Sequence, residues 1–80
     1  MTVKKRRANT TILKRLINLL NEKGFLYYKD VKFVVRSVDR KLDKHSVRFV
    51  ADDAVAFLVF LCLVKKRTFR SERVYFLNGR

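Results

Sequence analysis

The sequence has few of the residues from which metal centres, disulfides and phosphate-binding loops are built. Among its 80 residues are one cysteine (Cys62), one histidine (His45), two glycines and no proline. A single cysteine excludes an internal disulfide and a multi-cysteine metal site, and His45 lacks partners for a zinc ligand set. Two glycines cannot make a glycine-rich phosphate loop. We therefore expect no metal, no cofactor and no small-molecule substrate.

Catalytic groupings are also missing from the pattern. No Ser/His/Asp set and no paired-carboxylate cleft is recognisable. Asp52 and Asp53 are adjacent in the sequence, and adjacent residues of a helix point to different sides, which is wrong for a shared acid–base site. The sequence therefore predicts that the protein is not an enzyme.

Long hydrophobic runs are absent as well. The longest, from Ala54 to Val64, has 11 residues, whereas a membrane span needs about 20. The basic start MTVKKRRANTT has no apolar region or cleavage site for secretion. We expect a cytoplasmic, nucleoid-associated protein. Glutamine is absent and lysine and arginine are abundant, which favours a thermophilic source of archaeal type, although four asparagines weigh against it.

Acidic residues are scarce relative to basic ones. Twenty lysines and arginines stand against seven acids, for a net charge of +13. In a chain this short, such an excess indicates a nucleic-acid partner or an anionic membrane surface. The cations are spread over several segments rather than one amphipathic helix, which disfavours the membrane. Duplex DNA is the favoured partner, and RNA stays open because charge alone does not separate the two.

The hydrophobic periodicity predicts an α+β fold with three helices, a short strand and a C-terminal β-hairpin. Residues 1–8 are expected to form a basic arm and residues 9–78 a single domain. The first helix is expected to run from Asn9 or Thr10 to Lys23, with Gly24 as its left-handed stop, and a strand is expected over 25–28. A second helix is expected over about 29–44, followed by a turn at DKHS with Ser46 as a possible cap. A third helix is expected to start between 47 and 51, and a hairpin to span 63–77 with its turn at 69–72.

Basic residues concentrate in three parts of this plan. The arm holds Lys4, Lys5, Arg6 and Arg7; the second helix is expected to carry a row of Lys29, Lys32, Arg36, Arg40 and Lys44, with Arg48 just beyond; the hairpin has Lys65, Lys66, Arg67, Arg70 and Arg73. Each set is either a phosphate-contact surface or a solvated face, but ordinary solvated faces mix charge signs. We take these residues as the candidate nucleic-acid contacts.

Aromatic and apolar residues leave further alternatives open. Tyr27, Tyr28, Phe69 and Tyr75 are either core residues or stacking partners for bases, with Phe69 the best candidate for stacking. In the hairpin, Val64, Val74 and Phe76 are expected to face the core, and Cys62 is expected to be a small buried apolar residue.

The stretch FLVFLCLVKKRTFRSERVYFL, residues 57–77, resembles the end of the winged-helix family of DNA-binding domains. Leu58, Leu61, Leu63 and Val64 match the end of that family's third helix and the start of its wing, and Tyr75 and Leu77 match the returning strand. The resemblance spans about residues 10–77. It implies a winged helix-turn-helix fold and duplex DNA binding, in a transcriptional regulator or a chromatin-type protein.

One departure from that family bears on function. The family's third helix usually enters the major groove, but here it is expected to expose Asp52, Asp53, Val55 and Val59. Carboxylates facing phosphates oppose binding. The alternative is a small accessory subunit of a DNA-processing complex, such as a replicative polymerase. Its partner interface, in a homodimer or with another protein, would be Val55, Val59 and Phe60.

Overall fold

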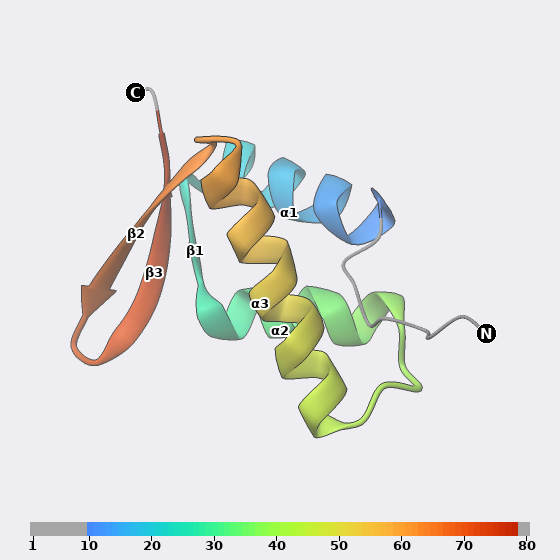
Figure 1. The fold of residues 1–80 in the computed structure, drawn as a ribbon. Helices are drawn as coiled ribbons and strands as arrows, with labels where there is room; N and C mark the ends of the chain where they lie inside the picture. Colours follow the sequence, from blue (N-terminus) through green and yellow to red (C-terminus); the bar gives the residue numbers. More distant parts are fainter. Residues whose placement is uncertain (1–9, 79–80) are drawn as a thin grey trace.

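A computed structural model describes residues 10–78 of the chain and has an α+β architecture (Figure 1). Three helices and three antiparallel strands follow one another along the chain: α1 (Thr10–Lys23), β1 (Phe25–Tyr27), α2 (Tyr28–Val38), α3 (Lys44–Phe60), β2 (Val64–Phe69) and β3 (Glu72–Leu77). The β2–β3 hairpin extends past the helices, with its tip free of them (Figure 1). The expected arm, residues 1–8, lies outside the described residues.

Helix α1 ends as its sequence predicts. Gly24 has a φ of 84°, in the left-handed region that favours glycine, and its N–H donates to the carbonyl of Leu20. The Gly24 carbonyl in turn accepts from the N–H of Leu77. The stop of the first helix therefore also anchors the end of the last strand.

The second helix is shorter than predicted, and the third begins earlier. Helix α2 ends at Val38 and α3 begins at Lys44, with Asp43 rather than Ser46 as its N-cap. The Asp43 carboxylate accepts from the Ser46 N–H at 2.8 Å, and the Asp39 carboxylate accepts from the Lys41 N–H at 3.2 Å. Two aspartates that bind backbone N–H groups thus break the expected helix 29–44 into a helix and a turn. The prediction of a continuous row of cations on one helix is therefore wrong.

The sheet has the strand order β1–β3–β2 and two different faces. Its register pairs Leu26 and Lys66 with Tyr75 on what we call the inner face, and it pairs Phe25 and Lys65 with Phe76 on the outer face. Leu26 and Tyr75 are each 1% exposed, whereas Phe76 is 42% exposed. The expectation that Val64, Val74 and Phe76 share a core-facing side is therefore wrong. Val64 joins the core, and Val74 is buried on the outer face.

The core lies between the inner face and the three helices. It consists of Ile12, Leu16, Leu20, Leu26, Val31, Val34, Val35, Val47, Val50, Ala51, Ala54, Val55, Leu58, Val64 and Tyr75. Every helix contributes one stripe to it, as the three- and four-residue spacing of apolar side chains requires. Among the described residues, no helix combines the length and apolarity that crossing a membrane requires.

Cys62 is exposed, contrary to the buried role expected of it. It has a φ of 61° and is the left-handed residue that ends α3. Its N–H donates to the carbonyl of Val59, and the next N–H, of Leu63, donates to the carbonyl of Leu58. This is the hydrogen-bond pattern of a Schellman motif, whose left-handed position turns the side chain away from the helix.

The hairpin turn consists of two residues in the left-handed region. Arg70 and Ser71 have φ values of 53° and 67°, as a type I′ turn between Phe69 and Glu72 requires. Neither residue is a glycine, so each bears a steric cost of about 1–2 kcal/mol.

We predict that Ser71→Gly stabilises the domain because it removes that cost at one position. The expected gain is about 1 kcal/mol, or a rise of roughly 4–8 °C in the midpoint of thermal unfolding for a domain of this size. Ser71→Ala, which retains a Cβ atom, is the matched control and should give no such rise. Equal midpoints for the two variants would contradict the proposed strain.

Candidate nucleic-acid interface

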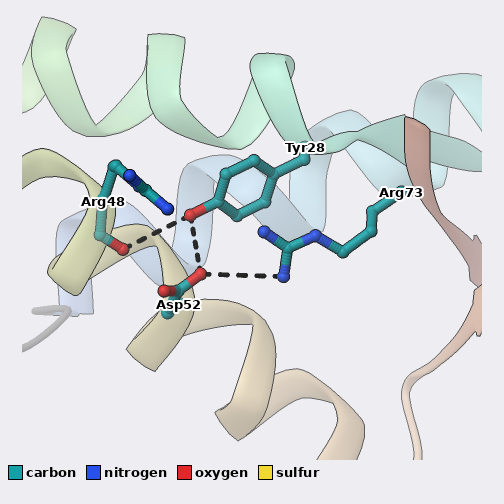
Figure 2. Close-up of polar contacts among 4 residues, drawn as sticks. All are labelled: Tyr28, Arg48, Asp52 and Arg73. Atoms are coloured by element: carbon teal, nitrogen blue, oxygen red, sulfur yellow. Dashed lines mark hydrogen bonds and ion pairs between the residues drawn. The ribbon is translucent and has the colours of Figure 1, made fainter. Parts of the chain in front are cut away.

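Three elements meet at the ring of Tyr28, in a group that we call the tyrosine cluster: Tyr28, Arg48, Asp52 and Arg73 (Figure 2). The Tyr28 hydroxyl donates to Oδ1 of Asp52 at 2.6 Å. It lies 3.4 Å from the Arg48 carbonyl. The guanidinium of Arg73 lies over the Tyr28 ring, with Cζ 4.1 Å from the centroid and Nη1 3.9 Å from Asp52 Oδ1. The cluster thereby links α2, α3 and the hairpin.

The tyrosine cluster changes the expected effect of Asp52 on phosphate binding. The sequence suggested that this carboxylate opposes phosphates, but its charge is shared with Arg73 and its Oδ1 accepts from Tyr28. Arg73 is correspondingly held against Tyr28 and Asp52 at the surface. The ion pair is half exposed and contributes little to stability, about 0–1 kcal/mol. Its main consequence is to place the hairpin relative to the helices.

The environment raises the pKa of Tyr28 from 10.0 to about 12. Burial disfavours the phenolate most, and the hydrogen bond to Asp52 and the charge of that carboxylate act in the same direction. The charges of Arg73 and Arg48 oppose the rise. Tyr28 is therefore a neutral hydrogen-bond donor throughout the physiological range.

We predict that Tyr28→Phe lowers the free energy of unfolding by about 1 kcal/mol at neutral pH, because Asp52 loses its donor. The folded pKa of Tyr28 is above the unfolded value, so its contribution is complete below pH 10 and is lost as the pH rises towards about 12. Denaturant unfolding of both proteins across that range is the measurement. The wild-type advantage should shrink with rising pH; an advantage that stays constant or grows would contradict the assignment.

Two lysines of α2 lie near the rings of Tyr27 and Tyr28. Lys32 Nζ lies 5.4 Å from the Tyr28 ring centroid, and Lys29 Nζ lies 5.6 Å from that of Tyr27. A groove of about 270 Å³ between α2 and the hairpin turn is lined by Tyr28, Lys29, Lys32, Ser71, Glu72 and Arg73. Three cations from two elements therefore border one groove, and Arg48 lies beside it on α3.

The remaining cations predicted for the second helix lie on three structural elements. Arg36 is one turn beyond Lys32 on α2, Arg40 is in the connecting turn, and Lys44 opens α3 one turn before Arg48. All three are exposed. Together they define what we call the basic band: Lys29, Lys32, Arg36, Arg40, Lys44 and Arg48.

The hairpin cations do not form one cluster. The strand register places Lys65 and Arg67 on the outer face, and Lys66 and Arg73 on the inner face. Arg70 lies in the turn, its Cζ 5.5 Å from the ring centroid of Phe69. The predicted contacts of the arm, Lys4, Lys5, Arg6 and Arg7, lie outside the described residues. The five hairpin cations predicted as one set of contacts are therefore divided between the two faces of the sheet and the turn.

The solvent side of α3 carries exposed apolar residues together with the exposed Asp52. Phe49 is 60% exposed, Phe60 is 79% exposed and Val59 is 42% exposed. The expectation that Val55 is exposed is wrong, because this residue is 7% exposed and belongs to the core. A groove of about 430 Å³ between α3 and the sheet is lined by Asp52, Val55, Ala56, Val59, Phe60, Lys66, Arg73 and Tyr75. A partner at this groove would meet mainly Val59 and Phe60.

The aromatic residues considered for stacking separate into different environments. Tyr75 is a core residue, 1% exposed, and Tyr28 is held in the tyrosine cluster. Phe69 is 57% exposed on the outer face. Sequence reasoning missed the pairing of Tyr28 with Asp52, which are 24 residues apart. No local spacing signals such a contact.

Comparison of the chain with protein-family models, with characterised proteins and with solved structures finds no match. Within residues 10–78, no three histidine, cysteine, aspartate or glutamate side chains gather as a metal ion would require. The described part of the chain thus offers three candidate contact surfaces: the basic band, the outer-face cations Lys65 and Arg67, and the exposed apolar residues of α3.

Proposed function

We propose that the chain is a winged-helix-like protein that binds duplex DNA through phosphate contacts. The observation that carries the proposal is the placement of Lys29, Lys32 and Arg73 along one groove at Tyr28. The Tyr28 hydroxyl joins α2 to α3 at Asp52 and the Arg48 carbonyl. Cations from separate elements that are held in one arrangement can follow a phosphate backbone, whereas a flexible basic tail cannot fix a register. In this proposal the hairpin is the wing.

The start of α3 supports the same phosphate-binding surface. Its positive end is capped by the Asp43 carboxylate, which accepts from the Ser46 N–H. The exposed cations Arg40, Lys44 and Arg48 nevertheless outnumber the two carboxylates of this region, Asp39 and Asp43. The excess of positive charge favours a phosphate at this end of the helix.

The proposed function has low sequence specificity. Base reading requires side chains such as Arg, Asn or Gln along a groove-facing helix. The solvent side of α3 instead presents Phe49, Asp52 and Phe60 beyond its first turns. Phosphate contacts therefore dominate the proposed affinity, and a general architectural role fits them better than recognition of one operator.

The experiment is binding of the full chain to a random-sequence duplex over a series of salt concentrations. Six cations of the basic band would give a slope of log affinity against log salt of roughly −5, at about −0.9 per phosphate neutralised. A pool of genomic fragments tests specificity in parallel, and enrichment of one site would indicate a regulator. Binding that is absent at low salt, or a slope near zero, would refute the proposal.

We also propose, as a second candidate, that the chain is an accessory subunit that docks on a protein through α3. The exposure of Phe60 (79%), Phe49 (60%) and Val59 (42%) on one helix favours it, because an exposed apolar patch is typical of a protein-interaction site. The basic band would then steady nucleic acid beside the partner. The two candidates use different surfaces and are separable.

Sedimentation at increasing concentration tests the second candidate. Wild-type protein should self-associate, or lose solubility, more readily than Phe60→Ser, because the apolar side of α3 is uncovered. Duplex affinity of Phe60→Ser should equal that of the wild type. A wild-type chain that stays monomeric and as soluble as Phe60→Ser at high concentration would contradict an exposed docking surface.

A further inference from the structure

The outer face of the sheet carries an aromatic surface that the duplex proposal does not use. The register places Phe25, Phe76 and Lys65 in one row across the strands, and Tyr27, Val74 and Arg67 in the next. The ring centroids of Phe25 and Phe76 are 6.4 Å apart, and those of Phe25 and Tyr27 are 5.7 Å apart. The aromatic rings therefore form one continuous patch over the buried Val74.

Phe69 extends this patch to the tip of the hairpin. It lines two adjoining open hollows together with Phe76: one of about 460 Å³ with Lys65, Arg67 and Thr68, and one of about 270 Å³ with Phe25, Tyr27 and Val74. Phe69 is 57% exposed and Phe76 is 42% exposed. Both rings are thus partly open to solvent beside Lys65 and Arg67, the two outer-face cations of the edge strand β2. The Arg70 Cζ lies 5.5 Å from the Phe69 ring centroid.

Cations border the patch on the other side too. Lys23 Nζ lies 5.5 Å from the Phe25 ring centroid, and Lys29 Nζ lies 5.6 Å from that of Tyr27. The three strands contain one carboxylate, Glu72, which pairs with Phe69 at the tip. Asp30 lies nearby and pairs with Lys23 at 3.8 Å. The surroundings of the aromatic patch are therefore mostly positive.

The positive charge around the aromatic patch determines which kind of binding partner fits the outer face. A second copy of the chain would bring Lys65 and Arg67 of one face against the same residues of the other. The arm brings Lys4, Lys5, Arg6 and Arg7, which have the same sign. An anionic partner with flat apolar groups is complementary to both features, and unpaired nucleotides have phosphates and exposed base faces.

We propose that the outer face binds single-stranded nucleic acid, with bases stacked on Phe69 and Phe76 and phosphates beside Lys65 and Arg67. Sheet aromatics that stack successive bases are an established mode of single-strand recognition. A closed duplex cannot use this surface, because its bases are already stacked on one another. The site lies on the outer face, whereas Arg73 of the tyrosine cluster lies on the inner face. It shares one bordering cation, Lys29, with the basic band and is otherwise distinct from the duplex surface proposed above.

The test uses labelled oligomers of thymidine and of uridine, roughly 12 nucleotides long and within the usual range of single-strand site sizes. Phe69→Leu should weaken binding of both oligomers about tenfold at every salt concentration, because stacking is lost while charge is unchanged. The double variant Lys65→Gln/Arg67→Gln should reduce the salt slope by about 1.4, at about 0.7 per phosphate of a single strand. Phe76→Leu should repeat the effect of Phe69→Leu.

The chain offers matched controls for both changes. Phe33 is 71% exposed on α2, so Phe33→Leu removes a more open ring elsewhere and should leave oligomer affinity unchanged. Lys66 lies on the inner face of the same strand as Lys65, and Lys66→Gln should reduce the slope by less than the roughly 0.7 of one phosphate contact. Duplex affinity should be the same in Phe69→Leu and the wild type, whether the duplex proposal holds or fails.

Two results would overturn this proposal. In the first, Phe69→Leu and Phe76→Leu bind both oligomers as Phe33→Leu does. In the second, sedimentation shows self-association that these two variants abolish while oligomer binding persists, which would assign the face to a second copy. Circular dichroism melting of each variant separates loss of binding from loss of fold.

Discussion

Replacing Lys32 and Arg48 by glutamine is expected to weaken duplex binding about 60-fold at 0.1 M salt. Each phosphate contact contributes a slope of about 0.9, so two contacts account for about 1.8 decades between 0.1 M and 1 M salt. The slope should therefore fall by about 1.8 while the chain stays folded. Both side chains lie at the tyrosine cluster, but neither provides one of its side-chain hydrogen bonds. Fluorescence anisotropy with a labelled duplex over a salt series measures both quantities.

The matched control is Lys14→Gln/Arg15→Gln on α1. These residues are exposed and carry the same charge, but α1 contributes no residue to the basic band or to the groove beside Tyr28. Removing them lowers the net charge equally and should change the slope far less. If the two double variants lose affinity to the same extent, binding depends on net charge alone, and no defined duplex surface exists.

Local signals in the sequence were sufficient where no competing signal was present. The apolar stripe of α1 has Ile12, Leu16 and Leu20 on one side, and Gly24 supplies a left-handed stop that few other residues tolerate. The hairpin was placed within a residue or two, because its strands are bounded by α3 and by a polar turn. Periodicity and one glycine specify these elements without help from tertiary contacts.

The boundary between α2 and α3 shows why other elements were harder to predict. Apolar residues recur at helical spacing from Val31 to Leu42, so periodicity alone continues the helix. The break depends on Asp39 and Asp43 binding backbone N–H groups, and aspartate is also common on ordinary helix surfaces. A cap at Ser46 was an equally good local reading. The outcome is decided by which arrangement lets α2 and α3 pack on one core.

The faces of the hairpin were undetermined for a similar reason. Strand β3 alternates Val74 and Phe76 with Tyr75 and Leu77, so both of its faces are apolar. A period of two then marks a strand but does not say which face meets the core. Pairing with Leu26 and contact with the helices select Tyr75. Because Tyr75 faces the core, Phe69 and Phe76 lie on the opposite face of the sheet and are exposed to solvent, which gives the aromatic surface.

Leu16→Ala is expected to cost about 3 kcal/mol of the free energy of unfolding, within a range of about 2–5 kcal/mol for a buried leucine. Leu16 is 0% exposed and lies on the core stripe of α1. An 80-residue domain has roughly 4–12 kcal/mol in total, so the variant approaches the limit of folding. Urea unfolding followed by far-UV circular dichroism measures the loss. Leu61→Ala, at a leucine that is 46% exposed, is the matched control and should cost less than about 1 kcal/mol.

Leu16→Ala and Lys32→Gln/Arg48→Gln should weaken duplex binding for different reasons, and temperature separates them. The basic band is assembled from α2, α3 and their connection, and the packed core and the tyrosine cluster hold the two helices together. In Leu16→Ala, affinity should therefore fall only as the folded fraction falls, and cooling towards maximum stability should restore it. In Lys32→Gln/Arg48→Gln the loss should persist at every temperature with an unchanged unfolding curve. Full duplex affinity in Leu16→Ala above its unfolding midpoint would show that binding needs basic residues but not the fold.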